Sequence, residues 1–260
     1  MFRVLPPFGG DHRAVAEIVN GIMNGKTNNT GLITLATGNA TTTTLYDERI
    51  SPDSKIVVIP FSDAAFADSA PYGQFTNNNN QSAPSTGSSA VVEFDTTEFS
   101  NGTYLDGSTK IYVRNKGLYN VQFSMQLVSY ANSLEYADVW FRQNGSDLPR
   151  SGSRFDLPIR KAAGDPSHII GTVNTFIDCD AGDYIELAGT VSSTDVQLES
   201  YAADTGIPRP SIPAVIFTVN YVAPLAYSNV YVSAQAKGSA TLTHYANSTS
   251  DKTYAYILVG

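Results

Sequence analysis

The most constraining feature of this sequence is a strict two-residue alternation over residues 118–130. In LYNVQFSMQLVSY, one set of alternate positions is apolar and the other is mainly polar. Because successive side chains of a strand point to opposite faces, the segment predicts a long strand with one buried face. The apolar positions are Tyr119, Val121, Phe123, Met125 and Leu127, and those opposite are Leu118, Asn120, Gln122, Ser124 and Gln126.

Shorter strand-like segments recur along the chain between turn residues. Such short strands at regular spacing predict an all-β chain whose central part forms an antiparallel sandwich or jelly roll. The central segments are 91–94, 110–113, 138–143, 174–179, 184–191, 196–202 and 214–222. Three further strands are expected before them, at 31–35, 41–46 and 55–60, and three after them, at 231–236, 239–246 and 253–260.

One helix is expected near the start of the chain, over residues 11–24. Asp11 is a candidate N-cap and Gly25 a candidate C′ residue. One apolar face is predicted from Val15, Ile18, Val19, Ile22 and Met23. Four turns are marginally stable alone, so this face must pack against something: its own sheet, or symmetry mates in a three-fold bundle.

Two other stretches are predicted to lack regular structure. Residues 69–90 are rich in Asn, Ser, Pro and Gly, a composition typical of a linker or long loop at a domain boundary. Residues 1–10 are either a disordered terminus or an extended arm that docks apolar side chains on a neighbour. Those side chains are Phe2, Val4, Leu5 and Phe8.

Composition excludes several classes of protein. Lys and Arg number 16 against 24 Asp and Glu, and the net charge of −8 argues against nucleic-acid binding. A single cysteine excludes a disulfide framework and a thiolate zinc site. No apolar run reaches the ~20 residues of a membrane span, and the N-terminus carries no signal-peptide core, so we expect no membrane insertion and folding in a cytoplasm.

Candidate sites of chemistry are few. Asp178, Asp180 and Asp183 could hold Ca²⁺, or could simply form the turn that starts the strand 184–191. No other cofactor is expected. His168 and His244 lie in no nucleophile motif, so no catalytic residue is assigned and the chain is not expected to be an enzyme. Trp140 is interpreted as a core or inter-subunit residue rather than a sugar platform.

Tyr and Arg side chains predict an exposed binding surface on the central block, because these residue types are enriched at binding hot spots. Any one of them could equally be solvated or lie in a subunit contact. The candidates are Tyr130, Tyr136, Arg142, Asn144, Arg150, Arg154 and Tyr201.

The two ends of the chain resemble a family of small tailed-phage structural proteins. The resemblance rests on N-G-K at 24–26, T-G-x-x-T-L at 30–35 and K-G-S-x-T-L-T-H at 237–244. Ala240 stands where an aromatic residue is usual. In typical members these segments are almost adjacent, so the resemblance implies a domain inserted between them.

The central block resembles the tumour-necrosis-factor/complement-globular-head jelly roll. The resemblance rests on GLYNVQFS at 117–124, WFRQNGSDLPRS at 140–151 and DCDAGDYIEL at 178–187, in that order. It implies a sandwich that is nearly always trimeric, and some relatives hold calcium near the trimer axis. We expect the three-fold contacts on apolar strand faces such as 119–127 and 215–221.

Together the resemblances imply a structural protein on the virion surface, made in the cytoplasm of the bacterial host. An arm (1–10) would precede a base (11–71 and 224–260) that carries an inserted jelly-roll head (72–223). The expected assembly is a homotrimeric fibre or spike bound to capsid, portal or tail proteins, its head contacting host glycan or protein. The alternatives are a decoration protein without a receptor and, less favoured, a polysaccharide depolymerase.

Overall fold

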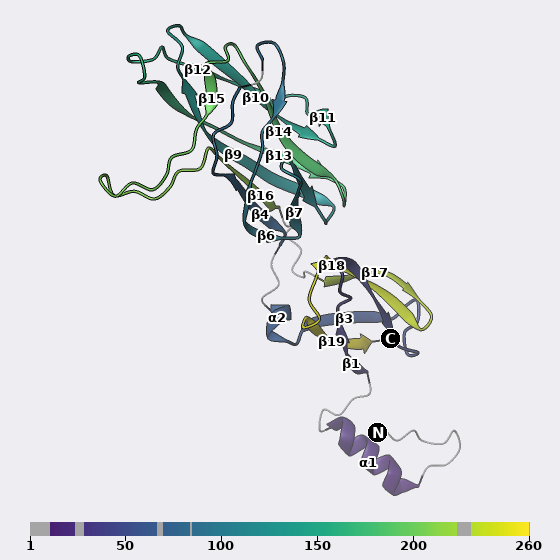
Figure 1. The fold of residues 1–260 in the computed structure, drawn as a ribbon. Helices are drawn as coiled ribbons and strands as arrows, with labels where there is room; N and C mark the ends of the chain where they lie inside the picture. The colour runs from purple at the N-terminus through teal and green to yellow at the C-terminus, as the bar shows by residue number, and fades with distance from the viewer. Residues whose placement is uncertain (1–10, 24–28, 67–69, 84, 223–229, 260) are drawn as a thin grey trace. The chain divides into compact units, whose positions relative to one another are not determined.

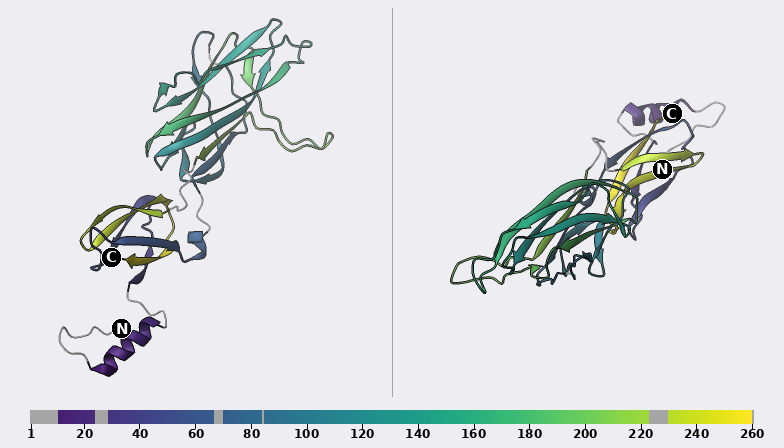
Figure 2. Two further views of the ribbon diagram at one scale, coloured as in Figure 1. Left: turned by 180° about the vertical axis from the view of Figure 1, so that it is seen from behind. Right: turned by 90° about the horizontal axis from the view of Figure 1, so that it is seen from above.

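The computed structural model describes residues 11–23, 29–66, 70–83, 85–222 and 230–259 (Figures 1 and 2). The chain divides into two compact units, one of residues 1–68 with 230–260 and the other of residues 69–229. The sequence placed its boundaries at 71/72 and 223/224. Antiparallel strands dominate both units, so the prediction of an all-β class is confirmed.

The first unit joins strands from both ends of the sequence. One sheet has the order β1-β19-β3 and the other β17-β18-β2, all pairs being antiparallel. A C-terminal strand therefore lies at the centre of each sheet. The strands are β1 (Thr30–Thr34), β2 (Ala40–Tyr46), β3 (Lys55–Pro60), β17 (Val230–Ala236), β18 (Ser239–Asn247) and β19 (Thr253–Val259).

A buried polar chain crosses the core of this unit. Leu35, Leu45 and Leu242 are buried there, and His244 of β18 lies among the buried residues as well. The Ala36 amide donates to Thr43 Oγ1 (2.8 Å), which lies 2.8 Å from His244 Nε2. His244 Nδ1 lies 2.7 Å from the Tyr245 carbonyl, which can only accept, so Nδ1 carries the proton and Nε2 accepts from Thr43.

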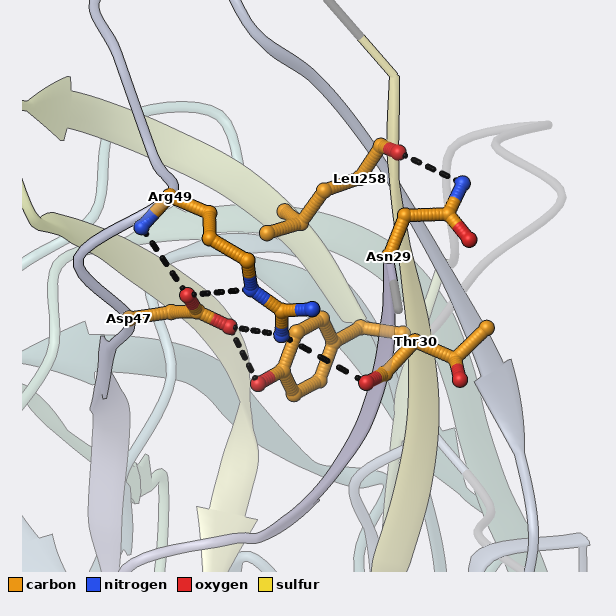
Figure 3. A network of polar contacts seen from close by, with 6 residues as sticks. Asn29, Thr30, Asp47, Arg49 and Leu258 are labelled. Atoms are coloured by element: carbon orange, nitrogen blue, oxygen red, sulfur yellow. Dashed lines mark hydrogen bonds and ion pairs between the residues drawn. The ribbon is translucent and has the colours of Figure 1, made fainter. Parts of the chain in front are cut away.

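A second polar network ties β1 and β19 to the segment that follows β2 (Figure 3). Asp47 accepts from Arg49 Nε at 2.8 Å and from the Tyr256 hydroxyl at 2.8 Å. Hydrogen bonds from Arg49 hold the pKa of the Asp47 carboxyl well below its usual value. Across the strand pair, Gly31 faces Tyr256, and a Cβ at position 31 would lie 2.3 Å from the tyrosine ring. Glycine therefore lets this ring cross β1 to reach Asp47.

The predicted helix is present as α1 (His12–Met23). Asp11 caps it, because its Oδ1 accepts from the Arg13 amide at 3.1 Å. Val15, Val19 and Met23 are exposed and Ile18 is half-buried. The side chain of Ile22, and the arm residues Phe2, Val4, Leu5 and Phe8, lie outside the described residues. A short helix α2 (Asp63–Phe66) follows β3.

The second unit is a sandwich of two sheets. The seven-stranded sheet has the order β11-β10-β14-β8-β7, with β12 beside β10 and β5 beside β14. Its strands are β5 (Ala90–Val91), β7 (Thr103–Asp106), β8 (Lys110–Val113), β10 (Glu135–Gln143), β11 (Ser146–Asp147), β12 (Ser153–Leu157) and β14 (Tyr184–Val191).

The six-stranded sheet has the order β13-β9-β16-β4-β6, with β15 beside β9. Its strands are β4 (Tyr72–Asn77), β6 (Thr96–Asn101), β9 (Gly117–Ser129), β13 (Ser167–Cys179), β15 (Val196–Leu198) and β16 (Val215–Tyr221). The first strand of this unit, β4, pairs with its last strand, β16. In the opposite sheet β8 pairs with β14. This nested pairing is the strand order of a jelly roll.

The apolar faces of β9 and β16 lie inside the sandwich. Phe123 and Phe217 are buried and both rings contact Phe141 of the opposite sheet, at 5.5 and 6.1 Å between centroids. Cys179 is buried in the same core, where burial raises the pKa of its thiol to about 12. Subunit contacts through the apolar faces of 119–127 and 215–221 are therefore a wrong prediction, because the core of the same chain covers these side chains.

The linker predicted over residues 69–90 is also wrong in part. Residues 72–77 form β4, which is hydrogen-bonded on both sides, to β16 and to β6. Side-chain amides hold the asparagines at the end of β4 and after it: Asn77 donates to the Glu93 carbonyl (2.9 Å) and Asn79 to Asp95 (2.8 Å). Among the described residues, no helix is long and apolar enough to cross a bilayer.

Candidate functional site

A row of three tyrosines crosses the outer face of the seven-stranded sheet. Tyr104 pairs with Tyr112 across β7 and β8, and Tyr112 pairs with Tyr184 across β8 and β14. The ring centroids lie 5.1 and 5.2 Å apart. Arg114 lies 4.3 Å from the Tyr104 ring and Lys110 lies 5.0 Å from the Tyr184 ring, so a cation contacts each outer ring. The row is a half-buried aromatic strip with positive charge beside it.

Charged side chains continue the same face across β14, β10 and β11. Arg142 Nη1 lies 3.8 Å from Glu186, which is buried, and Arg142 Nε lies 3.1 Å from Asp147. Trp140, two residues earlier on β10, donates from Nε1 to Asp147 Oδ1 at 2.8 Å. Trp140 is half-buried on this outer face and is not part of the core, so its interpretation as a core residue is wrong.

The far end of the face is formed by β10 and β12. Arg154 donates from Nε and Nη2 to the two carboxylate oxygens of Asp138, at 2.8 and 2.7 Å. This forked contact holds the pKa of Asp138 below its usual value. The Arg154 guanidinium also lies 3.8 Å from the centroid of the Tyr136 ring. Contacts within the chain therefore hold the side chains of Arg154 and Tyr136 in place.

The turn between β10 and β11 is built from Asn144 and Gly145, with φ of 51° and 78°. Two positive φ values in a two-residue loop are typical of a hairpin turn that matches the strand twist. The Asn144 amide donates to Asp183 Oδ1 (2.7 Å), and its oxygen accepts from the Tyr184 amide (3.0 Å). Asn144 thus joins the hairpin to the tyrosine row.

The calcium site suggested at Asp178, Asp180 and Asp183 is not formed. Asp183 already accepts from the side-chain amides of Gln143 and Asn144, both at 2.7 Å, and from the Asp180 amide at 2.8 Å. Asp180 pairs with Lys116 at 2.7 Å. No group of three or more His, Cys, Asp or Glu that could hold a metal ion occurs in the described part of the chain. The carboxylate of Asp183 therefore accepts the hydrogen bonds of a turn, which is the alternative that the sequence left open.

Four of the seven surface residues expected from the sequence share this face: Tyr136, Arg142, Asn144 and Arg154. Arg150 is exposed in the turn after β11, with φ of 67°. The sequence interpretation missed the tyrosine row. A signal was present, because each tyrosine alternates with an inward residue: Tyr112 follows Ile111, and Tyr184 precedes Ile185.

The remaining two candidates, Tyr130 and Tyr201, meet at the buried carboxylate of Glu199. Their hydroxyls lie 2.5 and 3.0 Å from the two Glu199 oxygens, and Tyr201 also contacts His168 Nδ1 at 3.0 Å. Burial and the bond to Glu199 raise the pKa of Tyr201 to about 12.

This cluster holds the base of a hairpin-like segment between β15 and β16, closed by bridges from Tyr201 to Ile212 and from Asp204 to Arg209. Figures 1 and 2 show the segment extending away from the sandwich.

The outer face of the six-stranded sheet has the opposite chemistry. On β13, the outward side chains from Ile170 to Phe176 include no Asp, Glu, Lys or Arg. The same holds for the outward side chains of β9, β16 and β4 that pair with this stretch across the sheet. Ile170 is 64% and Phe176 59% exposed. Between them, Asn120 and Asn174 exchange amide hydrogen bonds of 2.8 and 3.2 Å. This central part of the face is uncharged, amide-rich and partly apolar, whereas carboxylates occur toward its ends, at Asp178 of β13 and at Glu98 of β6, which accepts from Thr76 Oγ1 at 2.9 Å.

His244 is not placed to act as a general base. His244 is buried, and its ring nitrogens contact Thr43 Oγ1 and the Tyr245 carbonyl. A general base must reach the proton that it removes from a substrate, and a buried ring with both nitrogens engaged cannot do so.

No protein-family model and no curated protein matches this chain.

Proposed function

We propose that this chain is a structural protein of a tailed-phage particle, a homotrimeric fibre or spike with an outward jelly-roll head. The resemblances of its two ends and of its central block suggest this role. The uncharged central part of the outer face of the six-stranded sheet, between Ile170 and Phe176, is the observation that supports it most. In this proposal the face joins copies of the chain, while the face that carries the tyrosine row stays free for the host surface.

The chemistry of the uncharged face suits a contact between subunits. Charged residues are depleted in the centre of protein interfaces, and a stable obligate interface buries ~2,000 Å² or more. Ile170 and Phe176 stand out from this face on β13, and Asn120 and Asn174 already satisfy each other between them. Covering the central part of the face, from Ile170 to Phe176, would thus remove apolar surface from water without burying an ion.

The N-terminal helix supports the attachment part of the proposal. Val15, Val19 and Met23 are exposed on α1, and an isolated helix of this length is marginal in water. We propose that this apolar face binds its equivalents in two other copies, or a neighbouring particle protein. The arm residues before it would extend the same contact.

A specific observation also favours host recognition over pure decoration. The face that carries the tyrosine row combines Tyr112, Tyr184 and Trp140 with Arg142 and Arg154, which are the residue types found at binding hot spots. These side chains are fixed by neighbours, so ordering them for a partner costs little entropy. We propose that this face contacts glycan or protein on the host cell.

The mass of the full chain in solution tests self-association. By sedimentation velocity at micromolar concentration we expect a particle of three times the 27.9 kDa chain mass. Ile170→Glu with Phe176→Glu places charge in the proposed interface and should shift the population to monomer. Leu134→Glu is the matched control, because Leu134 is 78% exposed in a loop and should leave the trimer intact.

A wild-type monomer at this concentration would overturn the proposal, as would a trimer that tolerates both glutamates. The particle role needs a separate test. Electron microscopy of virions carrying a labelled copy of the chain should show label on the particle surface. Label that is absent from purified virions would contradict it.

Host recognition is tested with the same full chain. Binding of fluorescent protein to host cells should fall at least tenfold in Tyr112→Ala with Tyr184→Ala. Tyr231→Ala, an exposed tyrosine in the first unit, is the control and should bind as the wild type does. Equal binding by both variants, or none by the wild type, leaves the decoration role as the better description.

A further inference from the structure

A cavity inside the jelly roll is the strongest further candidate for a binding site. It lies between the two sheets, with β5, β10 and β14 on one side and β9 and β15 on the other. Its volume is about 80 Å³ and it is open to solvent on one side. A single water needs roughly 10–15 Å³ of such volume, so the cavity has room for a group of several heavy atoms.

The walls of the cavity are apolar. Met125 and Leu127 of β9, Val139 of β10 and Leu198 of β15 line it, and all four are otherwise part of the core. Ala137 of β10 and Gly189 of β14 also line the cavity, and their small size leaves the space between the two sheets open. None of the described residues that line the cavity carries a formal charge.

Of the four polar side chains at the cavity, which include Ser82, three have hydrogen bonds to neighbouring residues. Gln81 exchanges two hydrogen bonds with the Glu93 backbone (2.8 and 3.0 Å). Thr190 donates to the Ser88 carbonyl at 2.8 Å, and Gln197 donates to Glu199 at 2.9 Å. Water stays in a cavity when it has two to four polar partners, whereas apolar cavities remain dry and accept apolar molecules. The preferred occupant is therefore apolar.

We propose that this cavity binds the terminal part of a straight alkyl chain. A cavity of about 150 Å³ holds a benzene molecule, so a space of about 80 Å³ is too small for a six-carbon ring and holds about two to four carbons at the end of a straight chain. The chain enters through the open side, so a polar head group remains in solvent near Gln81 and Thr190. This inference does not depend on the proposed function, because it concerns the inside of the sandwich alone.

The probe is a series of 1-alkanols from ethanol to octanol, titrated into the full chain with labelled methyl groups. Saturable shifts are expected at the Met125 and Leu127 methyls. Each methylene that enters the cavity should lower Kd about fourfold, because burying one contributes a constant increment of transfer free energy. The gain should level off once the cavity is full. Neutral alkanols avoid any effect of the negative net charge of the protein.

Two matched variants decide where the alkanols bind. Ala137→Leu fills the cavity and should weaken hexanol at least tenfold, while raising the unfolding temperature because it fills a void. Ala163→Leu makes the same change in an exposed loop and should leave both quantities unchanged. If Ala137→Leu does not fold, Ala137→Val fills part of the cavity and should weaken hexanol more than ethanol, whose shorter chain needs less of the space.

Three results would overturn the inference. One is the absence of saturable methyl shifts with every alkanol. Another is equal hexanol affinity in the wild type and in the filled variant. The third is a set of shifts confined to Ile170 and Leu118, which would place the alkanols on the outer face of the six-stranded sheet.

Discussion

Replacing Gly31 by alanine tests whether the close contact of β1 with the Tyr256 ring of β19 stabilises the first unit. The backbone at Gly31 is not in the left-handed region, so alanine meets no conformational penalty there. The obstacle is Tyr256, which pairs with Gly31 across the two strands. An added Cβ would lie 2.3 Å from the Tyr256 Cζ and hydroxyl oxygen, far inside the 3.5–4.0 Å of a normal contact.

The expected loss of stability follows from what Tyr256 must give up. Its ring is 6% exposed and its hydroxyl donates to the Asp47 carboxylate at 2.8 Å. A hydrogen bond to a charged group contributes about 1.5–3 kcal/mol, and partial exposure of the ring adds to the loss. We expect Gly31→Ala to lower the free energy of unfolding of this unit by about 2–4 kcal/mol.

A double-mutant cycle isolates the clash. In a Tyr256→Ala background the obstacle is gone, so Gly31→Ala should be neutral or stabilise by about 0.4–1 kcal/mol through the unfolded chain. In a Tyr256→Phe background most of the clash remains, because the ring still occupies the space. The measurement is urea-dependent hydrogen exchange on peptides from β1 and β19, since Trp140 reports the other unit. An equal loss in the wild-type and Tyr256→Ala backgrounds would refute the reasoning.

Four further predictions use single substitutions. The Asp47 carboxyl has a pKa below its unfolded value of about 3.9, so its contribution is present above pH ~4 and lost as the pH falls further; acid unfolding should depend less steeply on pH in Asp47→Asn. Thr43→Val removes the hydroxyl between Ala36 and His244, and urea unfolding followed by hydrogen exchange should show a loss of about 1–3 kcal/mol. Because the pKa of Tyr201 is raised to about 12, its contribution is complete below pH ~10 and is lost as the pH rises toward 12; Tyr201→Phe should flatten that alkaline loss, measured by Trp140 fluorescence in urea. Gly145→Ala places a side chain at φ of 78° and should cost about 1–2 kcal/mol in the same fluorescence assay, with no change expected for exposed Ala163→Gly.

The local sequence pattern was sufficient to predict a strand where one face of that strand is buried. The alternation in 118–130 predicted β9 and its inward side chains, and Asp11 predicted the start of α1. Pattern failed for β4, whose segment YGQFTN carries few apolar residues and is a strand because β16 and β6 pair with it on both sides. Such pairing partners lie far away in sequence, and no local window contains them.

The candidate face was predicted only in part for the same reason. Residue type marked Tyr136 and Arg154 as surface candidates, but nothing local indicates that Tyr104 and Tyr184 contact the same neighbour, Tyr112. The large apolar ring of Trp140 predicted a place in the core or in a subunit contact; the core is excluded, because its position in β10 points it away from Phe141 and the core. The calcium site failed because spacing does not show which carboxylate oxygens a turn already uses.

The sequence by itself determined that this chain is built from strands, and which alternate positions enter a core, because both properties follow from the geometry of a single strand. The tertiary structure decided which outward side chains lie next to one another on each outer face. Register across sheets collects tyrosines and arginines on one face, amides and exposed apolar side chains on the other, and leaves a small apolar cavity between them. These arrangements depend on which distant strands pair, and that choice minimises the free energy of the whole fold rather than of any segment.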